Sequence, residues 1–249
     1  MKSVIRLFLT ALQFLTQLPV PAGDFHAEDL PKSLVFFPVV GLLVAAGGLL
    51  LHFALITRAG NQIMGLVLLI YLVLLTGGLH EDALADAADG FGGGWDKEQV
   101  LAIMRDSRIG SYGAIAIVFS LLSRFVLLTQ LPSTKFVAYF TAGQVLSRWT
   151  PLPLSFFLAS ARADSGQGSR VARKISWLSL LLGTIVAFGI AAFFLKGTLF
   201  WASATAVLIT ALTGTYYQRR LGGITGDCLG ATIQLAEIGV YLTGVVVRG

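Results

Sequence analysis

Long apolar runs dominate this chain and predict helices that cross a membrane. A bilayer span needs roughly 20 mostly apolar residues. Runs of this kind occupy residues 34–57, 62–79, 111–131, 135–157, 175–195, 198–216 and 228–247. The pattern therefore predicts an all-α fold, a polytopic membrane bundle of about seven transmembrane helices. We expect residues 1–249 to form a single integral membrane domain, because no separate soluble stretch is long enough to bury its own core.

The segment 4–18 has a different pattern, with apolar and polar residues on opposite faces of a helix. The apolar face holds Val4, Leu7, Phe8, Ala11, Phe14, Leu15 and Leu18, and the polar face holds Ser3, Arg6, Thr10, Gln13 and Gln17. Such an amphipathic helix is typical of the membrane interface. A cleaved signal peptide is the alternative, but the two glutamines interrupt the apolar region that it requires. Pro19 and Pro21 are expected to end the helix.

Composition supports lipid as the main solvent. Hydrophobic residues make up 55% of the chain and charged residues 12%, whereas a soluble domain carries about 25% charge. The net charge of +5 is therefore interpreted as membrane topology, and we expect no nucleic-acid partner. The single cysteine, Cys228, excludes an intrachain disulfide and a Cys-based metal site. His26, His52 and His80 are too far apart in sequence for a local zinc motif.

The basic residues indicate which loops face the cytoplasm. With the N-terminus inside, the cytoplasmic segments hold Lys2, Arg6, Lys32, Lys97, Arg105, Arg108, Arg162, Arg170, Arg173, Lys174, Arg219 and Arg220. The opposite side then holds only Arg58, Lys135, Lys196 and Arg248. This positive-inside bias supports an odd number of spans. It also places two polar loops, 77–113 and 217–230, on the cytoplasmic side.

The first of these loops gathers carboxylates. Seven of the thirteen acidic residues lie between Glu81 and Asp106. The stretch Gly77–Gly90 favours a helix, which Gly90 and the glycines at 92–94 are expected to end.

Three of these acids share one face of the predicted helix. Asp82, Asp86 and Asp89 are spaced i, i+4 and i+7, within an arc of roughly 60°. Carboxylates in this arrangement repel one another unless a cation lies between them, and hard oxygen ligands suit Mg²⁺. Glu81 lies about 100° off that face and can reach a metal only from the side. A solvated acidic surface is the alternative, although no Lys or Arg occurs from residue 80 to 96.

Two further segments carry candidate substrate-binding residues. Arg105, Ser107 and Arg108 flank Asp106 and match the geometry of a diphosphate; a positively charged anchor before the next span is the alternative. The second segment contains Gly223, Thr225 and Asp227. Its glycines permit close approach of a ligand, and Asp227 is a candidate to complete a metal site or orient a hydroxyl. A tight turn with Asp227 capping the last helix is the alternative.

Charged residues inside the predicted spans have both a structural and a functional interpretation. Arg124, Arg148 and Glu237 are costly in lipid and are expected to face the bundle interior. A buried ion pair of Glu237 with an arginine is one interpretation, and phosphate binding by Arg148 is the other. His80 is either a hydrogen-bond donor at the site or a histidine at a helix end.

Together these segments resemble the cobalamin synthase family, the adenosylcobinamide-GDP ribazoletransferases. The matching blocks are GGLHEDALADAADG at 77–90, MRDSRIG at 104–110 and LGGITGDCLG at 221–230, with weaker matches at FLTQLPVP (14–21) and FPVVG (37–41). They stand in the family's order and span most of the chain. The chain departs from the family's pattern at Gln17, where Arg is frequent, and at Ala83, where Gly is frequent.

The resemblance implies a Mg²⁺-dependent enzyme of the bacterial inner membrane. A hydroxyl of alpha-ribazole, or of its 5′-phosphate, attacks the phosphate joined to adenosylcobinamide in adenosylcobinamide-GDP, and GMP leaves. The residues fit such a reaction, because phosphoryl transfer depends on positioning and charge neutralisation. The predicted Mg²⁺ ligands are Glu81, Asp82, Asp86 and Asp89, and the predicted catalytic acids are Asp89 and Asp106. The predicted substrate-binding residues are His80, Arg105, Ser107, Arg108, Arg148, Gly223, Thr225 and Asp227.

Other functions remain as alternatives at this point. A CDP-alcohol phosphotransferase or a membrane prenyltransferase also uses an Asp cluster with Mg²⁺, and a cation transporter would place its acids at the membrane midplane. The expected partners are the small-molecule substrates and membrane lipid, with homo-oligomerisation left open. We also expect the helix 4–18 and the loop 159–174 to form the entrance for the corrinoid.

Overall fold

The computed structural model describes residues 2–20, 28–162, 172 and 174–247 of the chain. Its helices are α1 (Lys2–Leu15), α2 (Asp29–Ser33), α3 (Phe37–Leu55), α4 (Asn61–Thr76), α5 (Leu79–Gly93), α6 (Lys97–Ile103), α7 (Ser111–Gln130), α8 (Ser133–Trp149), α9 (Pro151–Phe157), α11 (Trp177–Leu195), α12 (Leu199–Leu221) and α13 (Gly226–Val246). Short 3-10 turns cover Leu34–Phe36 and Lys196–Thr198. Because the described part contains no strand beyond one isolated bridge between Ser160 and Ile224, the predicted all-α fold is confirmed.

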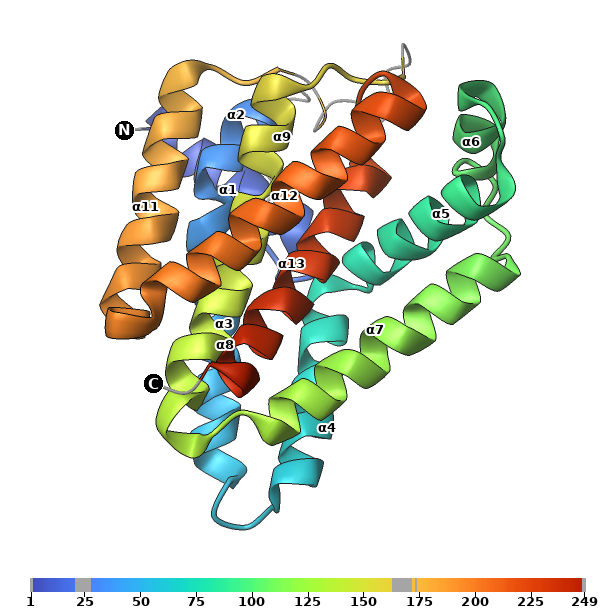
Figure 1. Cartoon of the computed structure of the whole chain (residues 1–249). Helices are drawn as coiled ribbons and strands as arrows, with labels where there is room; N and C mark the ends of the chain where they lie inside the picture. Colours follow the sequence, from blue (N-terminus) through green and yellow to red (C-terminus); the bar gives the residue numbers. More distant parts are fainter. Residues whose placement is uncertain (1, 21–27, 163–171, 173, 248–249) are drawn as a thin grey trace.

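Helices α8 and α13 form the centre of the bundle (Figure 1). Helix α13 packs against α5, α8 and α12, and α8 also packs against α3 and α11. Small residues allow these close approaches: a Cβ on Gly41 would overlap the carbonyl of Gln144, and one on Gly230 would overlap Ala83. Close packing through glycine is common between membrane helices, where there is little hydrophobic force to hold them together.

The seven predicted spans each coincide with helical structure, α8 and α9 sharing one of them. By length and composition, four stretches of the described chain can cross a membrane: Asp29–Leu55, Ser111–Gln130, Trp177–Leu221 and Gly226–Val246. A fifth is added if α4 and α5 count as one bent span. The third stretch contains both α11 and α12, which run in opposite directions (Figure 1). A multi-pass helical membrane protein is therefore confirmed, and the number seven stays a prediction.

A sharp bend between α4 and α5 positions the acidic segment. The two helix axes differ by 84°. Gly77 and Gly78 adopt the left-handed conformation, with φ of 64° and 70°, which is strained for residues with a side chain. As a result, the predicted span 62–79 ends at Thr76, and α5 turns away from the direction of α4 to run between α13 and α7 (Figure 1).

The N-terminal segment is helical as predicted, but α1 ends at Leu15 and not at residue 18. The backbone N–H of Gln17 donates to the carbonyl of Leu75 at 2.7 Å, so the chain leaves the helix to pair with α4 before it reaches Pro19. Phe14 stacks on Phe37 of α3 with ring centroids 5.9 Å apart. Helix α1 therefore packs onto the bundle beside the acidic segment.

Candidate active site

Helix α5 carries its carboxylates in three different environments. Asp82 is exposed, Asp86 is half-buried and Asp89 is buried. Burial and, after it, the negative charges of Asp82, Asp227 and Asp89 raise the pKa of Asp86 to about 7, although Arg162 opposes them. The charges of Asp82 and of Asp227 on α13 therefore both act on Asp86, and a metal site shared by these acids stays a prediction.

The turn that presents Asp227 is built by its neighbours. Gly222 ends α12 in the left-handed conformation, with φ of 67°. Thr225 caps α13: its hydroxyl accepts the N–H of Cys228 at 3.2 Å and donates to Asp227 Oδ2 at 3.2 Å. The alternative in which Asp227 is the N-cap is therefore wrong, because Thr225 occupies that position and Asp227 lies in the first turn.

Residues 159–162, at the start of the predicted polar loop, lie beside the turn that carries Asp227. Ala161 N–H donates to the carbonyl of Ile224 at 2.8 Å, and Ile224 N–H donates to that of Ala159 at 2.9 Å. This pairing brings Arg162 to Asp227, with Nη2 3.0 Å from Oδ2. A Cβ on Gly223 would overlap the carbonyl of Ala159, so this glycine is required by the backbone contact.

Arg162 is the clearest site residue missed by the sequence analysis. It is 65 positions from its partner, and no spacing rule links a loop to the turn before a distant helix. The loop 159–174 was expected to help form an entrance; its residues 163–171 and 173 lie outside the described residues.

A cavity of about 180 Å³ adjoins the acids. Its walls come from α1, α3, α5, α9 and the start of α13. The lining residues are Phe14, Leu15, Phe37, Leu79, His80, Asp82, Ala83, Pro151, Gly226, Asp227, Leu229, Gly230 and Ile233. His80 is 3% exposed, and neither of its ring nitrogens has a hydrogen-bond partner. The cavity therefore combines two carboxylates and an imidazole with an apolar wall to which α1 contributes.

Asp89 has partners of its own. Its two carboxylate oxygens accept the backbone N–H groups of Gly110, at 2.7 Å, and Gly113, at 2.8 Å. A Cβ on either glycine would overlap this carboxylate. Asp89 thus holds the first turn of α7, where a negative charge also interacts favourably with the helix dipole. This geometry explains the glycines of the segment 104–113 as well as the buried acid.

The expected diphosphate clamp is a loop on the surface. Arg108 is 87% exposed and pairs with Asp106, Nη2 to Oδ2 at 2.6 Å and Nε to Oδ1 at 3.0 Å. Hydrogen bonds from Arg108 lower the pKa of Asp106 to about 2. Arg105 and Ser107 are also exposed. Asp106 is not among the charges that act on Asp86, and its catalytic role stays a prediction.

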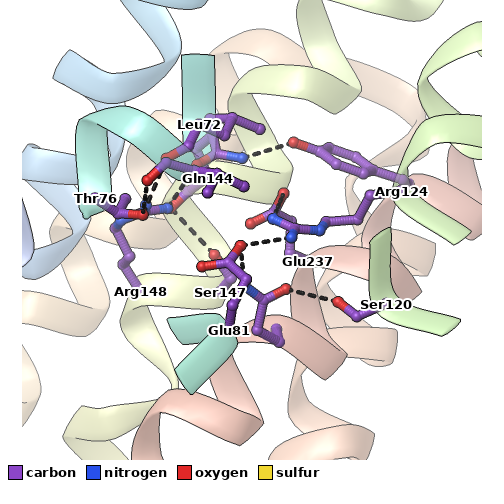
Figure 2. Close-up of polar contacts among 12 residues, drawn as sticks. Leu72, Thr76, Glu81, Ser120, Arg124, Gln144, Ser147, Arg148 and Glu237 are labelled. Carbon is purple, nitrogen blue, oxygen red and sulfur yellow. Dashed lines mark hydrogen bonds and ion pairs between the residues drawn. The ribbon is translucent and has the colours of Figure 1, made fainter. Parts of the chain in front are cut away.

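A buried polar network that includes Glu81, Arg124 and Glu237 lies in the interior of the bundle (Figure 2). Glu81 Oε1 accepts from Arg124 Nη2 at 2.5 Å and from Gln234 Nε2 at 2.9 Å. Arg124 Nη1 also lies 3.9 Å from Glu237, which confirms the predicted buried ion pair of Glu237 with an arginine. Glu81, expected at the metal, is in this network because it lies off the face of Asp82.

Arg148 belongs to the same interior. It is 1% exposed and donates from Nη1 to the carbonyl of Gln144 at 3.1 Å and to Gln144 Oε1 at 2.6 Å. Gln144 in turn donates to the hydroxyl of Tyr241 at 2.6 Å. Arg148 does not line the cavity beside Asp82; Figure 2 shows it in the interior network, and phosphate binding by Arg148 stays a prediction.

Known proteins match this chain over nearly its whole length. Residues 7–246 match the model of the family described as cobalamin-5-phosphate synthase. The chain belongs to the cobalamin-5-phosphate synthase family. It is similar to the adenosylcobinamide-GDP ribazoletransferase of Shewanella amazonensis, 36% identical over 97% of this chain and 95% of the relative. The enzyme of the same name from Chlorobaculum tepidum is 37% identical, over 94% and 92%. That of Ralstonia nicotianae is 38% identical, over 96% and 94%. No solved structure matches the chain.

As a member of this family, the chain can be tested for its fit to a divalent metal. Among the described residues, no three His, Cys, Asp or Glu side chains are already close enough together to hold an ion. Burial, followed by the charges of Asp82 and Asp227, nevertheless raises the pKa of Asp86 to about 7. Carboxylate oxygens are the donors that Mg²⁺ prefers. The carboxylates of Asp82, Asp86 and Asp227 are therefore the donors whose chemistry fits a divalent metal here.

Proposed function

We propose that this chain transfers the adenosylcobinamide phosphate moiety of adenosylcobinamide-GDP to alpha-ribazole or to its 5′-phosphate, and releases GMP. The family match over residues 7–246 and the shared name of the relatives support this reaction. In the transfer, a ribazole hydroxyl forms a new bond to the phosphorus joined to cobinamide. The bond from that phosphorus to the oxygen of the departing GMP breaks, and the hydroxyl proton is released.

One observation supports the proposed location of the active site. Asp82 of α5 and Asp227 of α13 line the cavity. Both carboxylates act on Asp86 of α5, and Arg162 is the cation that opposes their charges there. We propose these three carboxylates as the ligands of Mg²⁺. Glu81 and Asp89 are left out, because their oxygens accept hydrogen bonds from Arg124 and from the start of α7.

The chemistry then divides between the metal and the protein. When bound, Mg²⁺ supplies positive charge to the diphosphate and to the leaving GMP. The three carboxylates hold and orient the cation. His80 offers the substrate one N–H donor and one acceptor, because both its nitrogens are unpartnered. Phe14 and Phe37 give the cavity an apolar wall, which limits water around the reacting phosphate.

We further propose that the protein lies in the bacterial inner membrane with the N-terminus and this site on the cytoplasmic side. The bias of Lys and Arg toward that side supports the orientation. A proteoliposome assay tests it. Adenosylcobinamide-GDP is added outside the vesicles. Only protein molecules whose N-terminal tag can be cleaved by an external protease should then release GMP, because the tag and the site lie on the same side of the membrane.

Measurement of GMP release by purified protein tests the function. With adenosylcobinamide-GDP, alpha-ribazole and Mg²⁺, the wild-type protein should release GMP. Asp82→Asn should lower the rate by more than about 100-fold, since even residues that only support metal ligands cost 10–100-fold. Glu98→Gln is the matched control, because Glu98 is an exposed acid on the neighbouring α6. Asp82→Asn at the wild-type rate would contradict the site, and no GMP release by the wild type would contradict the function.

A further inference from the structure

We infer that Arg162 binds the diphosphate of the nucleotide substrate, and that it exchanges Asp227 for phosphate oxygens when a divalent cation joins the carboxylates. This inference rests on the proposed function and adds a substrate-binding residue to it. Arg162 comes from a loop that none of the sequence motifs includes.

The position of the guanidinium supports this role. Arg162 is 12% exposed and reaches Asp227 through one nitrogen, Nη2, at 3.0 Å. Its Nε is buried without a hydrogen-bond partner. A guanidinium has five N–H donors in a planar fork that matches phosphate oxygens. The side chain therefore has an unused donor and contacts Asp227, an acid that lines the cavity.

Electrostatics explains why Arg162 would exchange Asp227 for the diphosphate. Arg162 is the positive charge that acts against the carboxylates on Asp86, and thus the counter-ion of this cluster in the absence of metal. A divalent cation bound by the same carboxylates would take over their charge and repel the guanidinium. The nearest negative charge is then the diphosphate that shares the cation, and Arg–phosphate pairs are among the strongest charged hydrogen bonds.

The backbone allows this movement because it is fixed separately from the side chain. Residues 159–161 pair with Ile224. The Ser160 hydroxyl donates to the carbonyl of Arg162 at 3.0 Å and accepts its N–H at 3.4 Å. None of these bonds involves the guanidinium, so it can turn from Asp227 to a neighbouring ligand while Cα stays in place.

Arg162 is also closer to the cavity than Arg108, one of the two arginines expected from the sequence to bind the diphosphate. Arg108 lies 87% exposed with its guanidinium in two-point contact with Asp106. Arg162, by contrast, touches a residue that lines the cavity. A clamp for the diphosphate is needed beside the carboxylates, and Arg162 meets that condition.

Two measurements on the full-length variant Arg162→Gln test the inference. By titration calorimetry with MgCl₂, the variant should bind Mg²⁺ about two- to fivefold more tightly, because a competing cation of modest strength has been removed. In the GMP-release assay, KM for adenosylcobinamide-GDP should rise about 10- to 100-fold, the usual loss for a charged hydrogen bond. KM for alpha-ribazole should stay unchanged.

Controls separate this role from a structural one. Arg219→Gln removes the same charge from an exposed residue of α12 and should change neither value. Arg162→Lys keeps the charge and should bind Mg²⁺ like the wild type, with an intermediate KM, and it serves if the Gln variant does not fold. An unchanged KM for adenosylcobinamide-GDP in either folded variant would overturn the inference. A wild-type protein without Asp82-dependent Mg²⁺ binding would instead overturn the proposed metal site.

Discussion

Removal of the Glu81 side chain should destabilise the protein strongly, since Glu81 neutralises a charge in the bundle interior. Its Oε1 atom accepts from Arg124 at 2.5 Å and from Gln234 at 2.9 Å. In Glu81→Ala, Arg124 keeps only the 3.9 Å contact with Glu237 as an ion pair. Loss of one partner from a buried pair costs about 3–5 kcal/mol, and the remaining glutamate places the expected loss near the lower limit, at about 3 kcal/mol.

This loss corresponds to a measurable shift in melting temperature. For chains of this length, 1 kcal/mol lowers Tm by about 2–4 °C, so Glu81→Ala should melt about 6–12 °C below the wild type. Cys228 provides the assay. It is the one cysteine of the chain and is 0% exposed, so a thiol-reactive dye reports the temperature at which the bundle opens.

A double-mutant cycle isolates the charge. Arg124→Ala alone should also melt early, because two glutamates then lack an arginine. In the Glu81→Ala/Arg124→Ala protein the loss should be clearly smaller than the sum of the two single losses. A Glu81→Ala protein that melts within about 2 °C of the wild type, or strictly additive losses, would refute this account of the buried network.

Two further predictions concern the acids of α5. Asp89→Ala should lower stability by about 1–2 kcal/mol in the same assay, the usual cost of a lost cap, because the N–H groups of Gly110 and Gly113 lose their acceptor; a loss of Mg²⁺ binding as large as that of Asp82→Asn would contradict the capping role. Mg²⁺ affinity should fall about tenfold per pH unit below about pH 7 and level off above it, because the pKa of Asp86 is raised to about 7 and only the ionised carboxylate binds the cation. The same raised pKa means that the metal-free fold loses stability as pH rises from about 4 to about 7, and a calorimetric affinity that is equal at pH 5.5 and pH 8 would contradict this role of Asp86.

Much of the fold follows from local pattern. The apolar runs gave the helices of the bundle, and the i, i+4 spacing of Asp82 and Asp86 gave a common face on α5. The pairing of Glu237 with an arginine was also predictable, since lone charges are costly inside a membrane bundle.

Features that depend on tertiary contact were not predictable. The bend at Gly77 and Gly78 depends on backbone angles that a glycine pair permits without requiring. Asp89 resembles a third metal ligand by spacing, yet a contact with the start of α7 occupies it. Arg162 reaches Asp227 only because a loop pairs with Ile224, and sequence spacing contains no information about such a contact.

The central claim is that carboxylates of α5 and α13 hold a divalent cation beside the diphosphate. A crystal structure of the protein with Mn²⁺ and GDP tests it most directly, since Mn²⁺ replaces Mg²⁺ and is located by its anomalous scattering. We predict an anomalous peak for a Mn²⁺ ion that Asp82, Asp86 and Asp227 coordinate, with diphosphate oxygens among the remaining ligands of the ion. A Mn²⁺ ion coordinated by Glu81 or Asp89 instead would contradict the claim. Bound GDP without an anomalous peak beside α5 would also contradict it.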